Sequence, residues 1–356
     1  MSTVLIPDPE ALASIQPDLG QAPKTSVVSG RGSLLWLRIA LVLVACAAVI
    51  GIGTASDPTM RYGLIVGIIY AIAVLGSNAV TGVLGEISLS QGAFMACGAY
   101  LCVIGLEQGW PFWLALVVSV LVTAFLGALV AIPTVRLEGI FTALVTFALA
   151  FAVPDLIIQF RDQTGGQAGL PVPSGLTLVG QPVGGSDLTS LVVIVVVFAL
   201  AAVTSLLALH GRIGRVLVTI GEGGPAAECF GVRSRMWQVV VWTWASALGA
   251  LAGVFFAVTV GYLTPEVFPV MLSIMVLVGT VVGGARSALG ALIGGLLIGT
   301  VPPELQSVMP AETTGILFGA ILLLALLAGH GGVNSFIERV LVFGWSLARR
   351  DRNGAS

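Results

Sequence analysis

Long apolar runs constrain this chain more than any other feature of its sequence. The runs 34–53, 113–132, 191–209 and 316–328 are each apolar over most of their length. About 20 apolar residues are enough for a helix to cross the hydrocarbon core of a bilayer. Several such runs in 356 residues therefore predict an all-α polytopic membrane protein.

The alternatives to a helical membrane protein fit the composition poorly. Only 9% of the residues are charged and 57% are hydrophobic, which leaves too little charge to solvate the outside of a large soluble protein. The apolar runs do not alternate with polar residues, as the strands of a β-barrel would. Both alternatives are set aside.

Ten hydrophobic segments are expected, each a transmembrane or partly spanning helix. If the N-terminus is cytoplasmic and the segments alternate, only Arg61 and Arg161 of the 15 basic residues fall outside. Such a bias is what the positive-inside rule describes, so both termini are predicted to be cytoplasmic. The segments are 34–53, 62–80, 87–105, 111–132, 138–160, 189–209, 237–260, 268–284, 288–303 and 315–329.

Three regions follow from this pattern. Residues 1–33 are polar and rich in Pro, Ser and Gly, and are predicted to form a flexible cytoplasmic tail. Residues 34–335 form the membrane domain, with an outer loop at 161–188 and a polar loop at 210–236, and residues 336–356 form a cytoplasmic C-terminal tail. A signal peptide ending near Ser56 is the alternative for the first run, but its length favours a retained helix.

The two shorter segments raise the question of an internal repeat. The strings Gly85-Glu86-Ile87-Ser88 and Gly284-Ala285-Arg286-Ser287 both open a helix rich in Gly and Ala. Interrupted helices at corresponding places in two halves often mark a transport path. The alternative is that the small residues serve helix packing, and the sequence leaves both open.

Catalytic and metal chemistry have little support in this chain. Lys24 is the only lysine and follows Pro23, so no P-loop is present and the chain is not expected to hydrolyse ATP. No nucleophile elbow or zinc-protease motif occurs. Cysteines at 46, 97, 102 and 229 lack metal-ligand spacing, and we expect packing roles, no metal site and no enzyme activity.

The polar loop at 210–236 stands out between apolar segments. It carries Arg215, Glu222 and Glu228, and Pro225 and Gly231 suit the start and the stop of a short helix. Such a helix, with the small residues Ala226 and Ala227 on it, can lie in a groove of a partner. A solvated connector is the alternative.

Four stretches in a fixed order carry a resemblance to a known family. They are Ser77-Asn78 with 85–100, then 136–146 with 164–170, then the loop around Ala226-Ala227-Glu228, and finally 272–290. Together they cover roughly residues 60–330 and resemble the permeases of branched-chain amino-acid ABC importers, in particular the LivM-type membrane subunit. Glu86 stands where the family more often has glutamine, which leaves the substrate open.

The resemblance implies an ABC importer permease fold and a set of partners. These are a second related permease, two cytoplasmic ATPases and an extracytoplasmic binding protein, in the bacterial inner membrane. ATP and Mg²⁺ would be bound by the ATPases and no cofactor by this chain; membrane lipid surrounds it, and no nucleic acid is expected. The coupling residues would be Arg215, Glu222, Ala226, Ala227, Glu228 and Gly231.

The remaining candidate residues fall into two groups. Polar residues and a glycine near the interrupted helix are assigned to the substrate path, with bonding within or between helices as the alternative: Asn78, Glu86, Ser88, Ser90, Gln91, Gly92 and Thr146. Contact with the binding protein is assigned to Thr164, Gly165 and Gly166, with an ordinary surface loop as the alternative.

The expected function is therefore the membrane subunit of an ATP-driven importer of branched-chain or related amino acids. The same machine moving urea, short amides or small organic acids is a close alternative. A stand-alone secondary transporter or channel is a further one, although no predicted segment centre holds a titratable carboxylate or histidine. A membrane scaffold without transport is the last.

Overall fold

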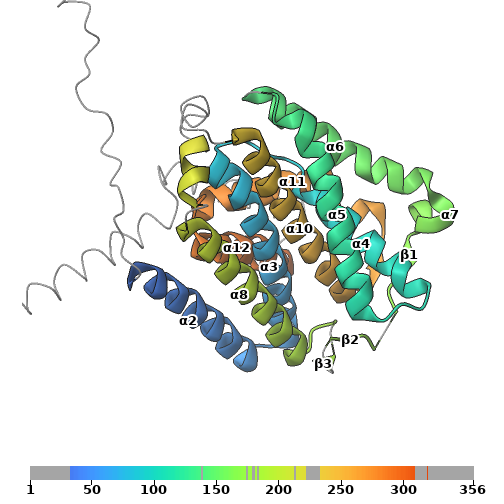
Figure 1. The fold of residues 1–356 in the computed structure, drawn as a ribbon. Coiled ribbons are helices and arrows are strands. Elements are labelled where there is room, and N and C mark those ends of the chain that lie inside the picture. The colour runs from blue at the N-terminus through green and yellow to red at the C-terminus, as the bar shows by residue number, and fades with distance from the viewer. Residues whose placement is uncertain are drawn as a thin grey trace, which may run out of the picture.

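The computed structural model describes residues 33–137, 139–173, 175–178, 181–182, 184–211, 214–221, 233–308 and 319. Within these ranges the protein is a bundle of long helices (Figure 1). Seven of the described helices are long and apolar enough to cross a membrane, and two shorter apolar helices accompany them, so the predicted polytopic all-α fold is confirmed. The predicted segment 315–329 and both predicted tails lie almost entirely outside the described residues.

The bounds of the helices follow the predicted segments closely. They are α2 (Ser33–Ala55), α3 (Pro58–Ser77), the π-helical η1 (Asn78–Leu84), α4 (Gln91–Glu107), α5 (Phe112–Thr134), α6 (Ile140–Gln159), α7 (Arg161–Thr164), η2 (Gly166–Ala168), α8 (Leu188–His210), α10 (Ser234–Val260), η3 (Pro265–Val267), α11 (Val270–Gly283) and α12 (Ala288–Val308). Residues 214–221 are also helical.

Short strands tie the outer connections together. β1 (Leu170–Pro171) pairs antiparallel with β4 (Tyr262–Leu263), and β2 (Thr177–Leu178) pairs with β3 (Gln181–Pro182). The first pair joins the loop after α6 to the loop after α10, although about ninety residues separate them. The long outer loop is thus anchored to the membrane domain.

α3 is the central helix of the bundle, and almost all of its side chains from Gly63 onward are buried. It packs mainly against α12, α10 and α8, while α10 packs mainly against α4 and α5. The core lies around this helix and includes the cysteines Cys46 and Cys102, as the sequence predicts. α5 and α6 form one side of the bundle in Figure 1 and expose large apolar side chains.

Glycines allow the central helices to approach closely. A Cβ at Gly295 of α12 would lie 2.2 Å from the backbone nitrogen of Ala71 in α3. A Cβ at Gly98 of α4 would lie 2.5 Å from the backbone of Ala250 in α10. The packing interpretation of the small residues is therefore confirmed at these crossings.

The packing also relates two halves of the bundle. In one group α10 and α4 both pack on α5, and in the other α3 and α11 both pack on α12. Gly85 and Gly261, with φ of 74° and 77°, end the first helical unit of each half. Residues 85–88 precede α4 and residues 284–287 precede α12, as the sequence predicts, and the internal repeat stays a prediction.

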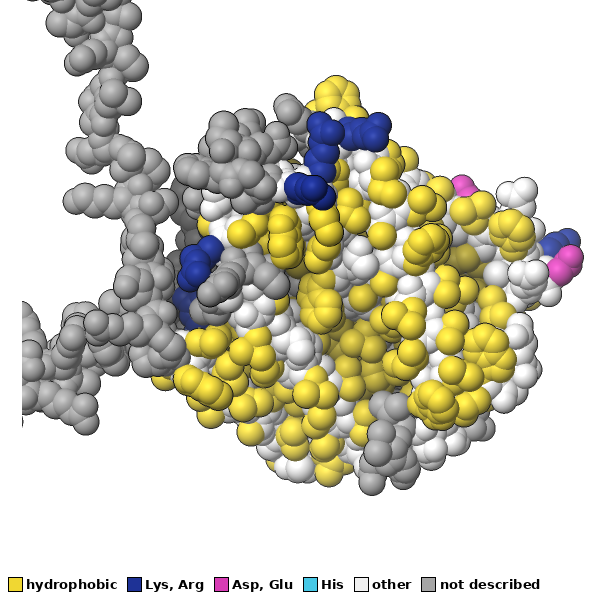
Figure 2. Space-filling view, in the orientation of Figure 1, with side chains coloured by type: hydrophobic (Ala, Val, Ile, Leu, Met, Phe, Trp, Pro, Cys, Tyr) yellow, Lys and Arg dark blue, Asp and Glu magenta, His cyan; other side chains and the backbone are white. Residues whose placement is uncertain are grey.

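The surface fits a membrane environment. Figure 2 shows a face that is mostly hydrophobic, with few acidic side chains; most of the basic side chains lie at the top and left of the view and one lies at the opposite edge beside an acidic side chain. Exposed large apolar residues include Leu121 and Phe125 of α5 and Leu200 of α8. Such a surface needs lipid or protein around it.

Candidate functional site

The connection between η1 and α4 interrupts two helices that are otherwise well packed. α3 and η1 together run for 27 residues, while α4 has 17, roughly 26 Å at 1.5 Å per residue. Residues 85–90 have no regular secondary structure and return from the end of the long unit to the buried start of the short one. Such a break is tolerated where protein or a water-filled cavity surrounds it.

Side chains from α6 and α11 satisfy the backbone of this break. The Leu89 N–H donates to Thr146 Oγ1 at 3.0 Å, and the Gly92 N–H donates to Ser273 Oγ at 3.0 Å. The hydroxyls of Ser88 and Ser90 lie 2.9 Å apart and are buried. The structure therefore brings four of the predicted path residues, Ser88, Ser90, Gly92 and Thr146, to one place where α4, α6 and α11 meet.

Gln91 joins helices at the same level. Its Nε2 donates to the carbonyl of Ala245 at 3.4 Å, while its Oε1 has no hydrogen-bond partner among the described residues. A Cβ at Gly76 would lie 2.9 Å from Nε2, and a Cβ at Gly249 would lie 2.5 Å from Oε1. The amide thus occupies space that two glycines leave free between α3 and α10, which favours the helix-joining interpretation for this residue.

Glu86 lies at the open end of the break, outside the spanning helices. Trp242 Nε1 donates to its Oε2 at 3.1 Å, and the side chain is half-buried. Burial raises the pKa of Glu86 above its ordinary value, and the hydrogen bond from Trp242 opposes that rise. The carboxylate is thus held by α10 rather than free in solution.

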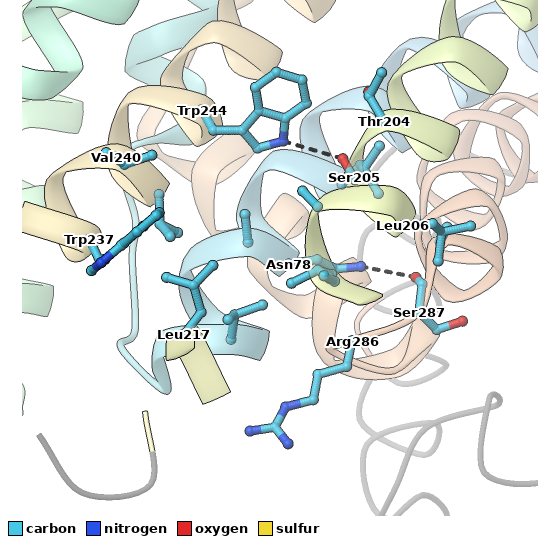
Figure 3. A pocket seen from close by; sticks show the side chains of 17 residues that line it. Asn78, Thr204, Ser205, Leu206, Leu217, Trp237, Val240, Trp244, Arg286 and Ser287 are labelled. Carbon is cyan, nitrogen blue, oxygen red and sulfur yellow. Dashed lines mark hydrogen bonds between the residues drawn. The ribbon is translucent and has the colours of Figure 1, made fainter. Parts of the chain in front are cut away.

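Asn78 lies elsewhere. It sits in η1, and its Nδ2 donates to the carbonyl of Ser287 at 3.1 Å. It lines a pocket of about 360 Å³ between α8 and α10 (Figure 3). None of the path residues from Glu86 to Gly92, nor Thr146, lines this pocket.

The outer turn after α6 is built from Thr164, Gly165 and Gly166. Thr164 Oγ1 donates to the carbonyls of Ile157 and Phe160 at 2.6 and 3.0 Å, and the side chain is buried. Both glycines have positive φ, 71° and 58°. The turn closes the end of α6, so these residues shape the loop; the predicted binding-protein contact stays a prediction.

Of the predicted coupling residues, the structure describes Arg215; Glu222, Ala226, Ala227, Glu228 and Gly231 lie outside the described residues. Arg215 is exposed on helix 214–221, while Leu217 and Ile220 pack with Val80 and Val83 of η1. A Cβ at Gly221 would lie 2.2 Å from the carbonyl oxygen of Val83. The polar loop is therefore attached directly to the helix that leads into the break.

Sequence reasoning missed two partners in this arrangement, Ser273 and Trp242. Ser273 could have been noticed as a single serine near the start of an apolar helix, and Trp242 as a tryptophan near the end of a spanning helix. Neither pattern indicates which residue forms the hydrogen bond with it. Among the described residues no group of three His, Cys, Asp or Glu side chains forms a metal site.

A helical membrane bundle with a buried, polar break between two of its helices is typical of membrane transport proteins. Residues 59–326 match the family model described as "Branched-chain amino acid transport system / permease component". The chain belongs to this family, as its sequence resemblance predicts.

Individual relatives agree with the family assignment. The chain is 29% identical over 290 residues to the high-affinity branched-chain amino acid transport system permease protein LivM of Escherichia coli, covering 74% of this chain and 66% of LivM. It is 25% identical to LivH of the same organism, covering 77% and 94%. It is 24% identical to the fructose import permease protein FruG of Bifidobacterium longum, covering 67% and 73%. The match thus spans just under two thirds of LivM, and no solved structure matches the chain significantly.

Proposed function

We propose that this protein is the membrane subunit of an ATP-driven ABC importer for branched-chain or related amino acids. The observation that carries the proposal is the direct packing of helix 214–221 on η1, whose end leads into the polar break at 85–90. A force applied to the loop at 210–236 would reach the break through this contact. Family membership supports the same reading.

The transport path would run beside the break and α6. One stripe of α6 is buried, formed by Thr142, Thr146, Ala150, Val153 and Ile157. The remaining faces are exposed or half-exposed, and they carry the exposed side chains of Asp155 and Phe151. Hydrocarbon penalises an ionised carboxylate, so this face would meet water or protein rather than lipid. A second, related permease facing α6 would complete the path.

The coupling step would be a two-state change driven by the ATPases. The two permeases together would bind two cytoplasmic ATPases, with the loop at 210–236 as the docking element of this chain. The ATPases would bind ATP and Mg²⁺, while this chain remains non-catalytic. Closure of the ATPase pair would favour one position of helix 214–221 and, through η1, one arrangement of the break. An extracytoplasmic binding protein would deliver the solute to the side of the strands β1 to β4.

The orientation follows the distribution of basic residues. Arg136, Arg215, Arg233, Arg235 and Arg286 all lie at helix ends or connections that the alternating topology assigns to one side. This side would be the cytoplasm, and both termini would lie there. The protein would thus sit in the bacterial inner membrane with the polar loop facing the ATPases.

Affinity purification of the chain from its native membrane, followed by mass spectrometry, tests the proposal. We expect two ABC ATPases and a second permease to come with it. Recovery of the chain alone, under detergent conditions that keep a known ABC importer intact, would contradict the assembly.

A further inference from the structure

The pocket that Asn78 lines is separate from the break, and its walls include Val83 and Leu217 from the contact between η1 and helix 214–221. α8 and α10 both pack on α3, and across the described residues they make little contact with each other. The gap between them has a volume of about 360 Å³. Its walls are mostly apolar and include Leu206, Leu209, Leu217, Val240 and Val241.

The pocket lies between α8 and α10, and part of its wall reaches the surface of the bundle. Trp244 Nε1 donates to Ser205 Oγ at 3.2 Å and joins α10 to α8 (Figure 3). Trp244 lies ten residues after the start of α10, and Ser205 lies five residues before the end of α8. These separations are roughly 15 and 7.5 Å along the helices at 1.5 Å per residue. Val240 is 47% and Trp244 38% exposed, so this wall reaches the apolar surface of the bundle.

One end of the pocket is polar and basic. Asn78 is only 5% exposed, and its Oδ1 has no hydrogen-bond partner among the described residues, although its Nδ2 is bonded to the carbonyl of Ser287. An unpaired buried acceptor is costly, so it calls for a donor inside the pocket. Arg286 Nε donates to the carbonyl of Gly82, and its guanidinium lies at the rim, pointing away from Ser287 (Figure 3). No Asp or Glu is among the described lining residues.

We propose that this pocket binds an anionic phospholipid with a hydroxyl-bearing headgroup, of the phosphatidylglycerol type, from the leaflet on the arginine-rich side. An acyl chain would fill the apolar part between α8 and α10. The phosphate would meet Arg286, and a headgroup hydroxyl would donate to Asn78 Oδ1. Each part of the molecule matches a part of the pocket: one basic end, one unpaired acceptor and an apolar remainder that opens to lipid.

Binding there has a structural consequence. Leu217 and Trp237 both line the pocket: Leu217 belongs to helix 214–221, inside the loop at 210–236, and Trp237 lies on α10 directly after this loop. A bound acyl chain would add packing between α8 and α10 at this end of the bundle. The lipid would therefore stabilise the region on which the polar loop is mounted, whether or not the chain works as an importer.

Photolabelling of the full chain tests the proposal. The chain is placed in phosphatidylcholine nanodiscs that contain a trace of phosphatidylglycerol with a diazirine on its acyl chain, and labelled peptides are mapped by mass spectrometry. We expect enrichment at residues 206–209, 217 and 237–244. The matched phosphatidylcholine probe should label these positions about fivefold less, since one basic residue near the headgroup contributes about 1 kcal/mol.

Three variants separate specific binding from general contact with lipid. Arg286→Ala should remove the fivefold preference, whereas Arg136→Ala, which replaces an exposed arginine at the end of α5, should keep it. Val240→Trp, at the half-exposed rim, should exclude both probes from residues 206–209 and 217 without lowering thermal stability. Equal labelling by both probes, labelling unaffected by Arg286→Ala, or labels spread evenly over the exposed face of α5 would each overturn the proposal.

Discussion

The contact between Gly92 and Ser273 allows the packing at the break to be tested by a double-mutant cycle. Gly92 N–H donates to Ser273 Oγ at 3.0 Å, and a Cβ at Gly92 would lie only 2.6 Å from the same oxygen. Ser273→Ala leaves a buried N–H unpaired, at a cost of about 1–3 kcal/mol. Gly92→Ala forces the hydroxyl away, so it loses the same hydrogen bond and adds packing strain of about 1–3 kcal/mol.

The double variant should cost little more than Ser273→Ala alone. With the hydroxyl gone, the next atom near the new Cβ is the Ser273 backbone nitrogen at 3.3 Å, which needs only a small shift. The two costs should therefore fall short of additivity by at least about 1 kcal/mol, within the range of coupling between contacting residues. Unfolding can be followed in mixed micelles titrated with SDS, using a thiol dye, because Cys46 and Cys102 are buried.

Gly98→Ala provides the matched control. A Cβ at Gly98 would meet the backbone of Ala250 at 2.5 Å, and removing the Ser273 hydroxyl does not relieve that contact. Its cost should add to that of Ser273→Ala. Strict additivity for the Gly92 and Ser273 pair as well would refute the described packing of α4 against α11.

Three further predictions concern coupling and titration. Glu228→Arg should abolish co-purification of ATPases while Glu228→Gln retains it, since a reversed charge repels a basic partner groove; pull-down from membranes measures this, and normal recovery would remove the docking role. Gly221→Val should push helix 214–221 away from η1, because a Cβ at position 221 would lie 2.2 Å from the carbonyl oxygen of Val83. ATP-dependent uptake should be abolished while membrane insertion stays normal; unchanged uptake would contradict the coupling contact. Trp242→Phe should destabilise the chain more at pH 8 than at pH 5. Burial raises the pKa of Glu86 above its ordinary 4.5, so the charged carboxylate destabilises the folded state at high pH and this effect is lost as the group is protonated at lower pH. Removing the hydrogen bond from Trp242, which stabilises the charged form, makes the destabilisation at high pH larger. A pH-independent loss of stability on thermal unfolding would count against it.

Hydropathy was sufficient to predict the spanning helices of this protein. The runs that became α2, α5, α6, α8 and α10 are long and apolar, and helix is the only open-ended structure that satisfies their backbone in a membrane. The extension of the second helix through η1 to Leu84 was not predicted, because a π-helical stretch leaves no mark on hydropathy. The helix at 214–221 was missed for a related reason: only its buried face, Leu217 and Ile220, shows what it packs on.

The site was only partly predictable. A polar start to an apolar helix indicated that residues 88–91 were special, and the structure does gather Ser88, Ser90 and Thr146. Asn78 was grouped with them, but the turn of η1 directs it to Ser287 and the pocket beside α8. Which side of the central helix a residue faces depends on contacts between segments far apart in the sequence, and a single chain's residue pattern does not contain these.

The most direct test of the importer mechanism is solute uptake into proteoliposomes. The chain would be reconstituted with its co-purifying permease and ATPases, with the binding protein outside and ATP inside, and radiolabelled leucine uptake measured. We predict uptake that requires ATP, the binding protein and all membrane subunits, and that is lost when the ATPases are omitted. Uptake by this chain alone, without ATP, would contradict the importer mechanism and favour a secondary transporter or channel.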